Sequence, residues 1–183
     1  MGFEPEIHVW TVGHSTRTAE EFVALLLENE IETLVDVRSY PSSRRLPHFN
    51  REQLASSLAQ NGIEYRHMPR LGGRRKPNPN SKNIAWNNES FRAYADYMEA
   101  PDFAEGVREL LQLAEKKPTA IMCAEALWWR CHRSLISDYL KSIGIAVTHM
   151  LGRGKTEPHR YTSAASIVAG ELSYQGLLTG NNT

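Results

Sequence analysis

Short apolar runs alternate with segments of helical spacing over the first third of the chain. Between these runs, apolar residues recur every three or four positions, as they do on the inner face of a helix. Thr18 and Glu21 fit a capping box at the start of the first helix, and Asn50 is placed to cap the second. Strands and helices that alternate through short links form parallel sheets with right-handed crossovers. The apolar runs predict three strands, at residues 7–12, 33–37 and 63–67.

The alternation stops at a long basic loop and then resumes. Residues 69–88 show no regular period, and the segment from Leu71 to Asn83 contains two glycines, two prolines and four basic residues. A loop of this length in a compact domain is usually functional or disordered. Five further elements are predicted after it: helices at about 91–98 and 101–117, a strand at 120–122, a helix that ends near Ser142, and a strand at 145–150.

Residues 1–183 are expected to form a single α/β domain, a three-layer sandwich around a mostly parallel sheet of about five strands. After the fifth strand we expect a loop, a helix of small residues from about Ser163, and a frayed tail at 180–183. The fold is Rossmann-like, but no Gly-x-Gly-x-x-Gly follows the first strand and no Gly-x-x-x-x-Gly-Lys-Ser/Thr occurs. We therefore expect no dinucleotide and no other cofactor.

The composition is that of an ordinary soluble globular protein. Lysine and arginine number 21, as do aspartate and glutamate, so zero net charge gives no global attraction to nucleic acid or membrane. Two cysteines are too few for a disulfide framework, which favours a reducing compartment. No signal peptide is expected, and no stretch approaches the roughly 18 apolar residues of a membrane span. A cytoplasmic location without membrane contact is expected, and a homodimer is compatible with the sequence.

Reactive and charged side chains follow the strand at 120–122. Cys123 and Glu125 fall at its carboxyl end, where open α/β sheets bind ligands. The start of a helix carries positive dipole potential, so basic side chains there are unfavourable unless an anion is bound. The sequence therefore predicts an anion site at the start of the next helix, which carries three such side chains: Arg130, His132 and Arg133.

The first two strands end in further polar residues. In a doubly wound sheet these ends lie beside the end of the central strand, so their side chains are expected to converge on Cys123 and Glu125. Arg38 has the geometry to bind an anion with two donors. Two alternatives stay open, namely that Ser15 caps the first helix and that Asp36 holds Arg38 in place. The polar residues in question are His14, Ser15, Asp36 and Arg38.

The order and spacing of these junctions resemble one family. The segments that carry the resemblance are Val12-Gly-His-Ser15, Leu34-Val-Asp-Val-Arg38 with Pro41, Leu71-Gly-Gly73, Cys123-Ala-Glu125, Cys131-His-Arg133, His149 and Pro158-His159. Together they resemble the family named domain of unknown function 488, from about residue 9 to residue 170. The resemblance implies a compact α/β domain of a cytoplasmic, prokaryotic protein, and it implies no activity.

Each candidate has a structural alternative. Cys123 is either a buried core residue or a thiol with a lowered pKa, whereas Cys131 falls on the apolar stripe of the predicted helix and is interpreted as core. Glu125 is a general acid or base if burial under Trp128 and Trp129 raises its pKa, or else it pairs with an arginine. No metal site is expected, because the spacing of Cys123, Cys131 and His132 does not match common zinc sites.

The leading hypothesis is a hydrolase or transferase for a phosphate-bearing or nucleotide-like substrate. Glu125 would act as general acid or base with His14 or His132, and Trp128 and Trp129 would form a wall for a flat base. Anion binding is assigned to Arg38, Arg130 and Arg133, and His159 in a second basic loop borders the same cleft if the fifth strand flanks the central one. Two alternatives are a nucleic-acid-binding module that uses the two basic loops, and a thiol enzyme that works through Cys123.

Overall fold

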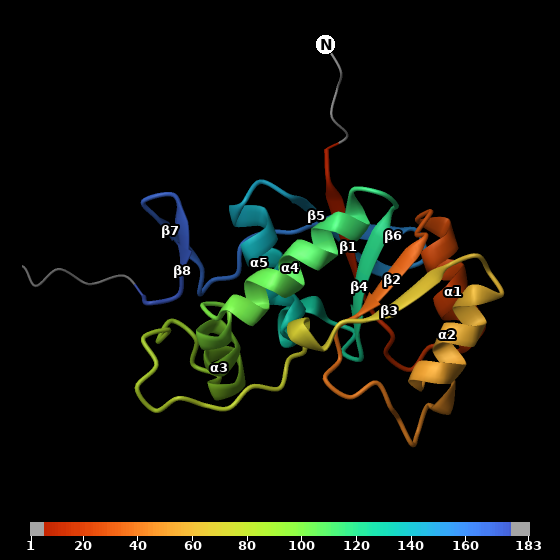
Figure 1. The fold of residues 1–183 in the computed structure, drawn as a ribbon, viewed down its shortest axis with the longest axis horizontal. Coiled ribbons are helices and arrows are strands. Elements are labelled where there is room, and N and C mark those ends of the chain that lie inside the picture. Colours follow the sequence, from red (N-terminus) through yellow and green to blue (C-terminus); the bar gives the residue numbers. More distant parts are fainter. Residues whose placement is uncertain (1–5, 177–183) are drawn as a thin grey trace, which may run out of the picture.

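Six strands form the central sheet of the computed structural model, which describes residues 6–176 (Figure 1). They are β1 (His8–Gly13), β2 (Thr33–Asp36), β3 (Glu64–His67), β4 (Thr119–Cys123), β5 (Ala146–Gly152) and β6 (Lys155–Pro158). Their spatial order is β3-β2-β4-β1-β5-β6, and every neighbouring pair is parallel except β5 and β6. The predicted α/β fold with a mostly parallel sheet is confirmed, and β6 adds an antiparallel edge.

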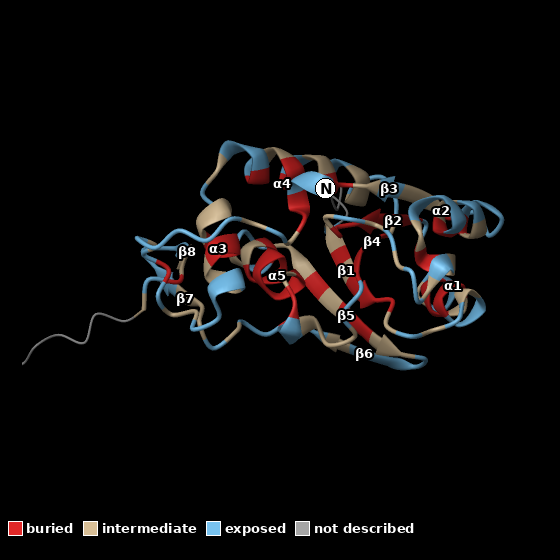
Figure 2. Cartoon of the chain, turned by 90° about the horizontal axis from the view of Figure 1, so that it is seen from below, coloured by how far each residue is buried: buried red, intermediate tan, exposed pale blue. Residues whose placement is uncertain are grey.

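Helices cover both faces of this sheet. Helices α1 (Ala19–Glu28) and α2 (Arg51–Ala59) lie on one face, and α3 (Glu89–Tyr97), α4 (Pro101–Ala114) and α5 (Arg133–Ser142) lie on the other (Figure 1). Alternate residues of β4 face opposite layers, so Ala120 packs with α1 and α2 while Ile121 packs with α4 and α5. Buried residues accordingly run along the strands and the inner sides of the helices (Figure 2).

The order of the strands creates a crevice at their carboxyl ends. The chain forms β1, β2 and β3 with its connections on the α1 and α2 face, and then returns on the other face to insert β4 between β2 and β1. The segments that follow β1 and β2 therefore turn toward one face, while the segment that follows β4 turns toward α5. Neighbouring strands whose connections run to opposite faces of the sheet form the usual ligand-binding crevice of an open α/β fold.

Local sequence signals fix several helix ends. Thr18 accepts a hydrogen bond from the backbone of Glu21, and the Glu21 carboxylate accepts one from the backbone of Thr18, so the predicted capping box is confirmed. Gly144 has a φ of 86°, which lets the chain turn out of α5. Asn50 precedes α2, but its side chain accepts a hydrogen bond from the Ser43 backbone instead of capping the helix.

One sequence-based prediction about the carboxyl-terminal third is wrong, and one condition set there is not met. The helix expected from about Ser163 is a hairpin of β7 (Ser166–Val168) and β8 (Glu171–Ser173). Ala169 and Gly170 both have positive φ, the backbone of a tight hairpin turn, and this turn outweighs the helical preference of the small residues. In addition, β5 adjoins β1 and not the central strand β4.

The tail at 180–183 lies outside the described residues, so the predicted fraying is not addressed by the structure. Within residues 6–176, none of the helices has the length and apolar character needed to cross a membrane.

We expect Thr18→Ala to lower the free energy of unfolding by about 1 kcal/mol, because it removes the acceptor for the Glu21 backbone N–H. Urea titration of the purified protein measures this change. Thr18→Ser keeps the hydroxyl group and should lose much less. Equal losses in the two variants would show that packing of the Thr18 methyl group, and not capping, accounts for the effect.

Candidate functional site

A groove with a volume of about 870 Å³ opens at the carboxyl ends of β1, β2 and β4. The long loop contributes one wall through Gly73, Arg74, Arg75 and Pro77, and residues 39–43 contribute another. The groove therefore lies where the topology places the crevice. Six of the candidate residues from the sequence line it together: His14, Arg38, Cys123, Glu125, Cys131 and His132.

The two cysteines form a close pair in the wall of this groove. The Sγ atoms of Cys123 and Cys131 are 3.0 Å apart, and both cysteines are reduced. Cys123 is the last residue of β4, whereas Cys131 follows a 3-10 turn at Trp128–Arg130 and has an extended backbone. The prediction that Cys131 lies on the apolar stripe of the helix is therefore corrected, because α5 begins only at Arg133.

A buried arginine lies behind the cysteine pair. The Nε atom of Arg133 donates to Cys123 Sγ at 3.0 Å and to Cys131 Sγ at 3.1 Å, and the Arg133 backbone N–H donates to Cys131 Sγ at 3.3 Å. Another guanidinium nitrogen donates to the carbonyl of Glu125. Arg133 is 1 % exposed and does not line the groove, so its charge acts on the sulfur atoms from inside the protein.

These contacts favour a single thiolate on the pair. Burial opposes ionisation of Cys131, but the hydrogen bond from Cys123 and the charge of Arg133 outweigh it and hold the Cys131 pKa well below its ordinary value. Burial and the hydrogen bond to Cys131 raise the pKa of Cys123 well above its ordinary value. Cys131 is therefore the thiolate, and Cys123 keeps its proton and donates to it.

Arg38 is held by the protein and presents little of its guanidinium group to the groove. Its Nε and Nη2 atoms donate to the two carboxylate oxygens of Asp36 at 2.9 and 2.7 Å, and Nη2 also donates to the carbonyl of Phe49 at 2.8 Å. The contact between Asp36 and Arg38 that the sequence left open is thus present. Only Nη1 points to a groove residue, His14, whose Nε2 lies 3.4 Å away.

His14 is a neutral, buried imidazole. Its Nδ1 atom donates to the carbonyl of Ser15 at 2.8 Å, and its ring stacks on Phe49 with a centroid separation of 4.1 Å. Burial lowers its pKa to about 4, so at neutral pH the Nε2 atom carries a free lone pair that accepts from Arg38. His14 can therefore accept a proton or a hydrogen bond at the groove wall.

The long loop packs tightly against His132. The Nε2 atom of His132 donates to the carbonyl of Val37 at 2.9 Å. A Cβ atom on Gly73 would lie 2.5 Å from the Nδ1 atom of the same ring, so only glycine permits this approach. The loop is thus an ordered wall of the groove. Arg75 is fixed there by the carbonyls of Pro69 and Gly72.

Glu125 lines the groove, but its surroundings differ from those expected. The residue is exposed, and its carboxylate accepts a hydrogen bond from the Leu127 backbone at 3.3 Å. No arginine within the described part of the chain forms an ion pair with it. The expected burial under two tryptophans is therefore not found, because those side chains turn away from the groove.

Besides Arg133, four candidate residues lie outside the groove. Trp128 stacks on His149 with a centroid separation of 4.2 Å and donates to the Glu157 carboxylate, so it forms no wall of this groove. Arg130 is exposed in the 3-10 turn, and Ser15 neither caps α1 nor lines the groove. His159 is buried, and it does not border this groove because β5 flanks β1.

A chain of buried polar groups connects Arg133 with Asp138. Arg133 Nη1 donates to Thr11 Oγ1 at 3.3 Å, and Thr11 Oγ1 lies 2.6 Å from His149 Nδ1. His149 Nε2 is 2.8 Å from His159 Nδ1, and His159 Nε2 is 2.8 Å from Asp138 Oδ1. In the neutral tautomers of His149 and His159 in which Asp138 accepts from His159, each earlier bond in the chain donates in the same direction, from Arg133 toward Asp138.

Sequence reasoning missed this polar chain. Its signal was a polar residue in the middle of each of two strands, since Thr11 of β1 and His149 of β5 are buried and paired in register. The other oxygen of Asp138 accepts from the hydroxyl groups of Thr162 and Tyr174 at 2.6 and 2.8 Å. The chain therefore links the cysteine pair to the segment that carries the terminal hairpin.

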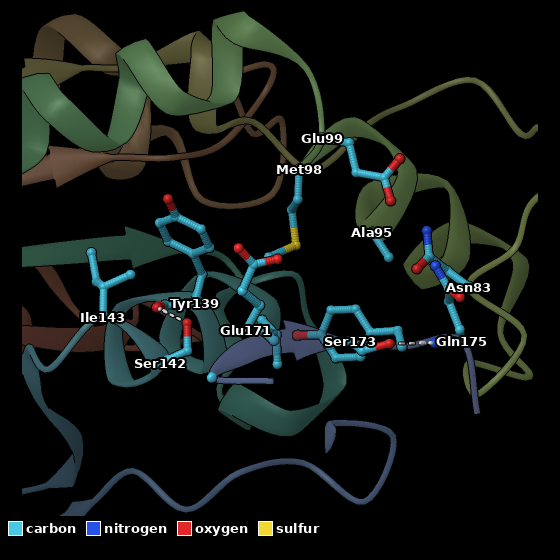
Figure 3. Close-up of a pocket in the computed structure, with 13 residues that line it drawn as sticks. Asn83, Ala95, Met98, Glu99, Tyr139, Ser142, Ile143, Glu171, Ser173 and Gln175 are labelled. Carbon is cyan, nitrogen blue, oxygen red and sulfur yellow. Dashed lines mark hydrogen bonds between the residues drawn. The ribbon is translucent and has the colours of Figure 1, made fainter. Parts of the chain in front are cut away.

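A second cavity, of about 310 Å³, lies between α3, α5 and β8 (Figure 3). Met98 and Tyr139 point into it beside Glu171, and Glu99 lies at its edge (Figure 3). Its described lining residues include no cysteine, histidine or arginine. The groove at the strand ends is therefore the better candidate for chemistry. Within residues 6–176, no group of three or more metal-ligating side chains is placed to hold an ion.

We expect His14 to make the protein less stable in acid. Its pKa is about 4 in the folded protein and about 6.5 in the unfolded chain, so the unfolded state binds the proton more tightly. The stability due to neutral His14 is full above about pH 6.5 and is lost as the pH falls toward about 4. Between about pH 7 and pH 4.5, this residue should remove roughly 2 kcal/mol from the free energy of unfolding, which urea titration measures.

His14→Asn is the matched control, because its amide group still has a donor for the carbonyl of Ser15. The free energy of unfolding that is lost between about pH 7 and pH 4.5 should be smaller in this variant by roughly 2 kcal/mol. Burial lowers the pKa of His149 to about 2, and this residue contributes equally to the pH dependence of both proteins. Equal losses in the two proteins would contradict the neutral, buried state of His14.

Comparison with known proteins places the chain in a family. Residues 18–140 match the family model described as domain of unknown function DUF488. No curated protein and no solved structure matches the chain. The matched segment includes β2, β4, the long loop, both cysteines and Arg133, and it spans more than half of the chain. The chain therefore belongs to the family described as domain of unknown function DUF488, as its strand-end motifs predicted.

Proposed function

We propose that the groove is the active site of an enzyme that uses the Cys131 thiolate on a small anionic substrate, of a phosphate-bearing or nucleotide-like kind. The observation that carries the proposal is the buried guanidinium group of Arg133, whose Nε atom donates to both sulfur atoms. A buried arginine needs a negative partner, and the sulfur pair supplies it. Among the alternatives from the sequence, thiol chemistry is therefore favoured, with Cys131 in the role first considered for Cys123.

The surroundings of Cys131 are those of a nucleophile. The thiolate is the reactive form of cysteine, and a cationic neighbour or a helix amino terminus lowers the pKa that controls it. Cys131 precedes α5 by two residues and has Arg133 beside it, so both influences act on it. In this proposal Cys131 attacks the substrate and forms a bond from sulfur as the leaving group departs.

Glu125 supports the same chemistry as a proton carrier. It is the sole carboxylate among the described lining residues, and it is open to solvent. In the proposed reaction its acid form gives a proton to the leaving group, and its carboxylate form later takes a proton from the water that releases the product. His14, whose Nε2 atom faces Arg38 Nη1 at 3.4 Å, is a second proton acceptor that lines the groove.

The charge and size of the groove support an anionic substrate. Arg38, Arg74 and Arg75 line it together with one carboxylate, and Asp36 offsets only Arg38. Arg74 is exposed, so its guanidinium group is accessible to a ligand. A volume of about 870 Å³ falls within the range of about 300–1,000 Å³ that is usual for small-molecule sites.

The nucleic-acid-binding alternative finds less support. Arg66 pairs with Glu64, and Arg70 pairs with Glu109, so part of the first basic loop region is already neutralised. The second basic loop follows β5, which is separated from β4 by β1. The two loops that this alternative requires therefore follow strands that are not neighbours in the sheet.

We expect iodoacetamide to modify Cys131 selectively and rapidly in the folded protein near pH 7. The rate should follow an apparent pKa below about 8.5, the ordinary value for cysteine, because Arg133 stabilises the thiolate. Peptide mass spectrometry at a series of pH values measures the site and the rate. Cys131→Ser should lose the fast reaction, whereas Cys123→Ser should keep it. Modification only after unfolding would contradict the proposal.

The same measurement with iodoacetate tests the preference for anions. Relative to the unfolded chain, the folded protein should favour the anionic reagent over neutral iodoacetamide, because the groove is lined by arginines. Arg74→Gln should reduce this preference without slowing the reaction with iodoacetamide. A ratio that is the same in the folded and unfolded chains would remove the anionic substrate from the proposal.

A thermal-shift screen tests the class of substrate. A ligand present at 100 times its dissociation constant adds about 2.7 kcal/mol to stability, which raises the midpoint by a few degrees. We expect a shift with inorganic phosphate or mononucleotides that Arg74→Gln weakens. A shift with oligonucleotides alone, steeply dependent on salt, would favour the nucleic-acid-binding alternative.

A further inference from the structure

The cysteine pair contains one more thiol than nucleophilic attack requires. The chain has two cysteines, and both side chains line the same groove. Their Sγ atoms are 3.0 Å apart, and a disulfide bond is about 2.05 Å long, so an approach of about 1 Å would join them. Cys123 is thus the group nearest to any product formed on the Cys131 sulfur.

The backbone on one side of the pair is suited to this approach. Cys123 is fixed at the end of β4, where its carbonyl accepts a hydrogen bond from the backbone of His14. Cys131 lies at the end of a segment that includes exposed residues, among them Glu125, Trp129 and Arg130. A small adjustment at the exposed residues 129–130 can therefore move the Cys131 sulfur while Ala124 and Glu125 stay fixed beside β1.

We propose that Cys123 and Cys131 form a reversible intramolecular disulfide when a hydroperoxide enters the groove, and that this bond switches the Cys131 thiolate off. The inference rests on the proposed function, because it regulates the same thiolate. It assigns to Cys123 a role that nucleophilic attack leaves unfilled, since this thiol is held beside the nucleophile and opens to the same groove.

The oxidation proceeds in two balanced steps. The Cys131 thiolate attacks one peroxide oxygen, the O–O bond breaks, and the leaving oxygen takes a proton, which gives a sulfenic acid and water or an alcohol. Cys123 then loses its proton and attacks the Cys131 sulfur, and the S–O bond breaks with release of water. Overall, two thiols lose two electrons and form the disulfide, and the peroxide is reduced.

Arg133 makes the disulfide easy to reduce. In the reduced protein its Nε atom donates to both sulfurs, but a disulfide carries no charge and is a weak acceptor. Oxidation therefore leaves a buried guanidinium group whose remaining partners are neutral, the carbonyl of Glu125 and the hydroxyl of Thr11. Because the reduced form is selectively stabilised, the pair is a reversible switch and not a permanent structural crosslink.

The test treats the reduced full-length protein with a slight excess of hydrogen peroxide and follows intact mass and free thiols. The expected product is a monomer that has lost two hydrogen atoms and both free thiols, and dithiothreitol restores them. Its reaction with iodoacetamide should be lost and regained in parallel. Cys123→Ser should instead give a sulfenic acid on Cys131 that dimedone traps. A wild-type product that gains two oxygen atoms, or a disulfide-linked dimer, would overturn the inference.

This test separates the inference from the proposed function. If Cys131 is alkylated rapidly but peroxide oxidises it to a sulfinic acid, the disulfide switch is ruled out and the proposed nucleophile stands. Disulfide formation without rapid alkylation removes the proposed nucleophile and with it the regulatory role, although the bond itself forms.

A redox titration against glutathione tests the part played by Arg133. In Arg133→Gln the disulfide should be at least about tenfold harder to reduce, which corresponds to about 30 mV, because the variant has no charge that stabilises the reduced pair. Equal equilibrium constants would overturn this role of Arg133. If the variant does not fold, the wild-type reduction equilibrium decides: a disulfide that excess glutathione leaves intact would overturn reversibility.

Discussion

The buried guanidinium group of Arg133 is the interaction on which the site depends. A charge taken out of water must find compensation, and removal of a single partner typically costs several kcal/mol. Arg133 finds it in two sulfur atoms, and it also holds the carbonyl of Glu125 at the start of the segment after β4. Gly13 is required beside that carbonyl, because a Cβ atom there would lie 1.9 Å from it. The same arginine therefore fixes both the packing of β1 against the segment after β4 and the ionisation of the two thiols.

The polar chain that leads away from Arg133 explains how so many polar groups are tolerated in the core. Each donor from Thr11 to His159 meets an acceptor, and the Asp138 carboxylate closes the chain. A fully satisfied network of this kind rigidifies its surroundings, whereas a partly satisfied one is costly. Most of its members lie outside residues 18–140, the segment matched by the family model. The matched segment contains the sulfurs and the arginine, and outside it Thr11 supplies one further acceptor for that arginine.

The sequence predicted where the site lies better than what it contains. Strand alternation placed His14, Arg38 and Cys123 at one edge of the sheet, because the topology of parallel strands follows from local patterns. Cys131 was misplaced, since helical spacing cannot reveal a 3-10 turn followed by one extended residue. Arg133 was expected to bind an external anion, but its partner is a thiolate of the protein itself. Such a contact joins residues whose side-chain directions are set by tertiary packing, which one sequence does not encode locally.

One arginine beside two sulfurs also determines how the pair ionises. Two thiolates 3.0 Å apart would repel each other strongly in a buried place, and a single guanidinium group offsets a single negative charge. The first proton therefore leaves easily and the second with difficulty, because the second ionisation would place two negative charges beside one guanidinium group. Cys123 retains the second proton and donates it to Cys131, which stabilises the thiolate and keeps Cys123 from competing as a nucleophile. Cys123 must release this proton before a disulfide can close, so it affects the second step of the oxidation and not the attack of the Cys131 thiolate on the peroxide.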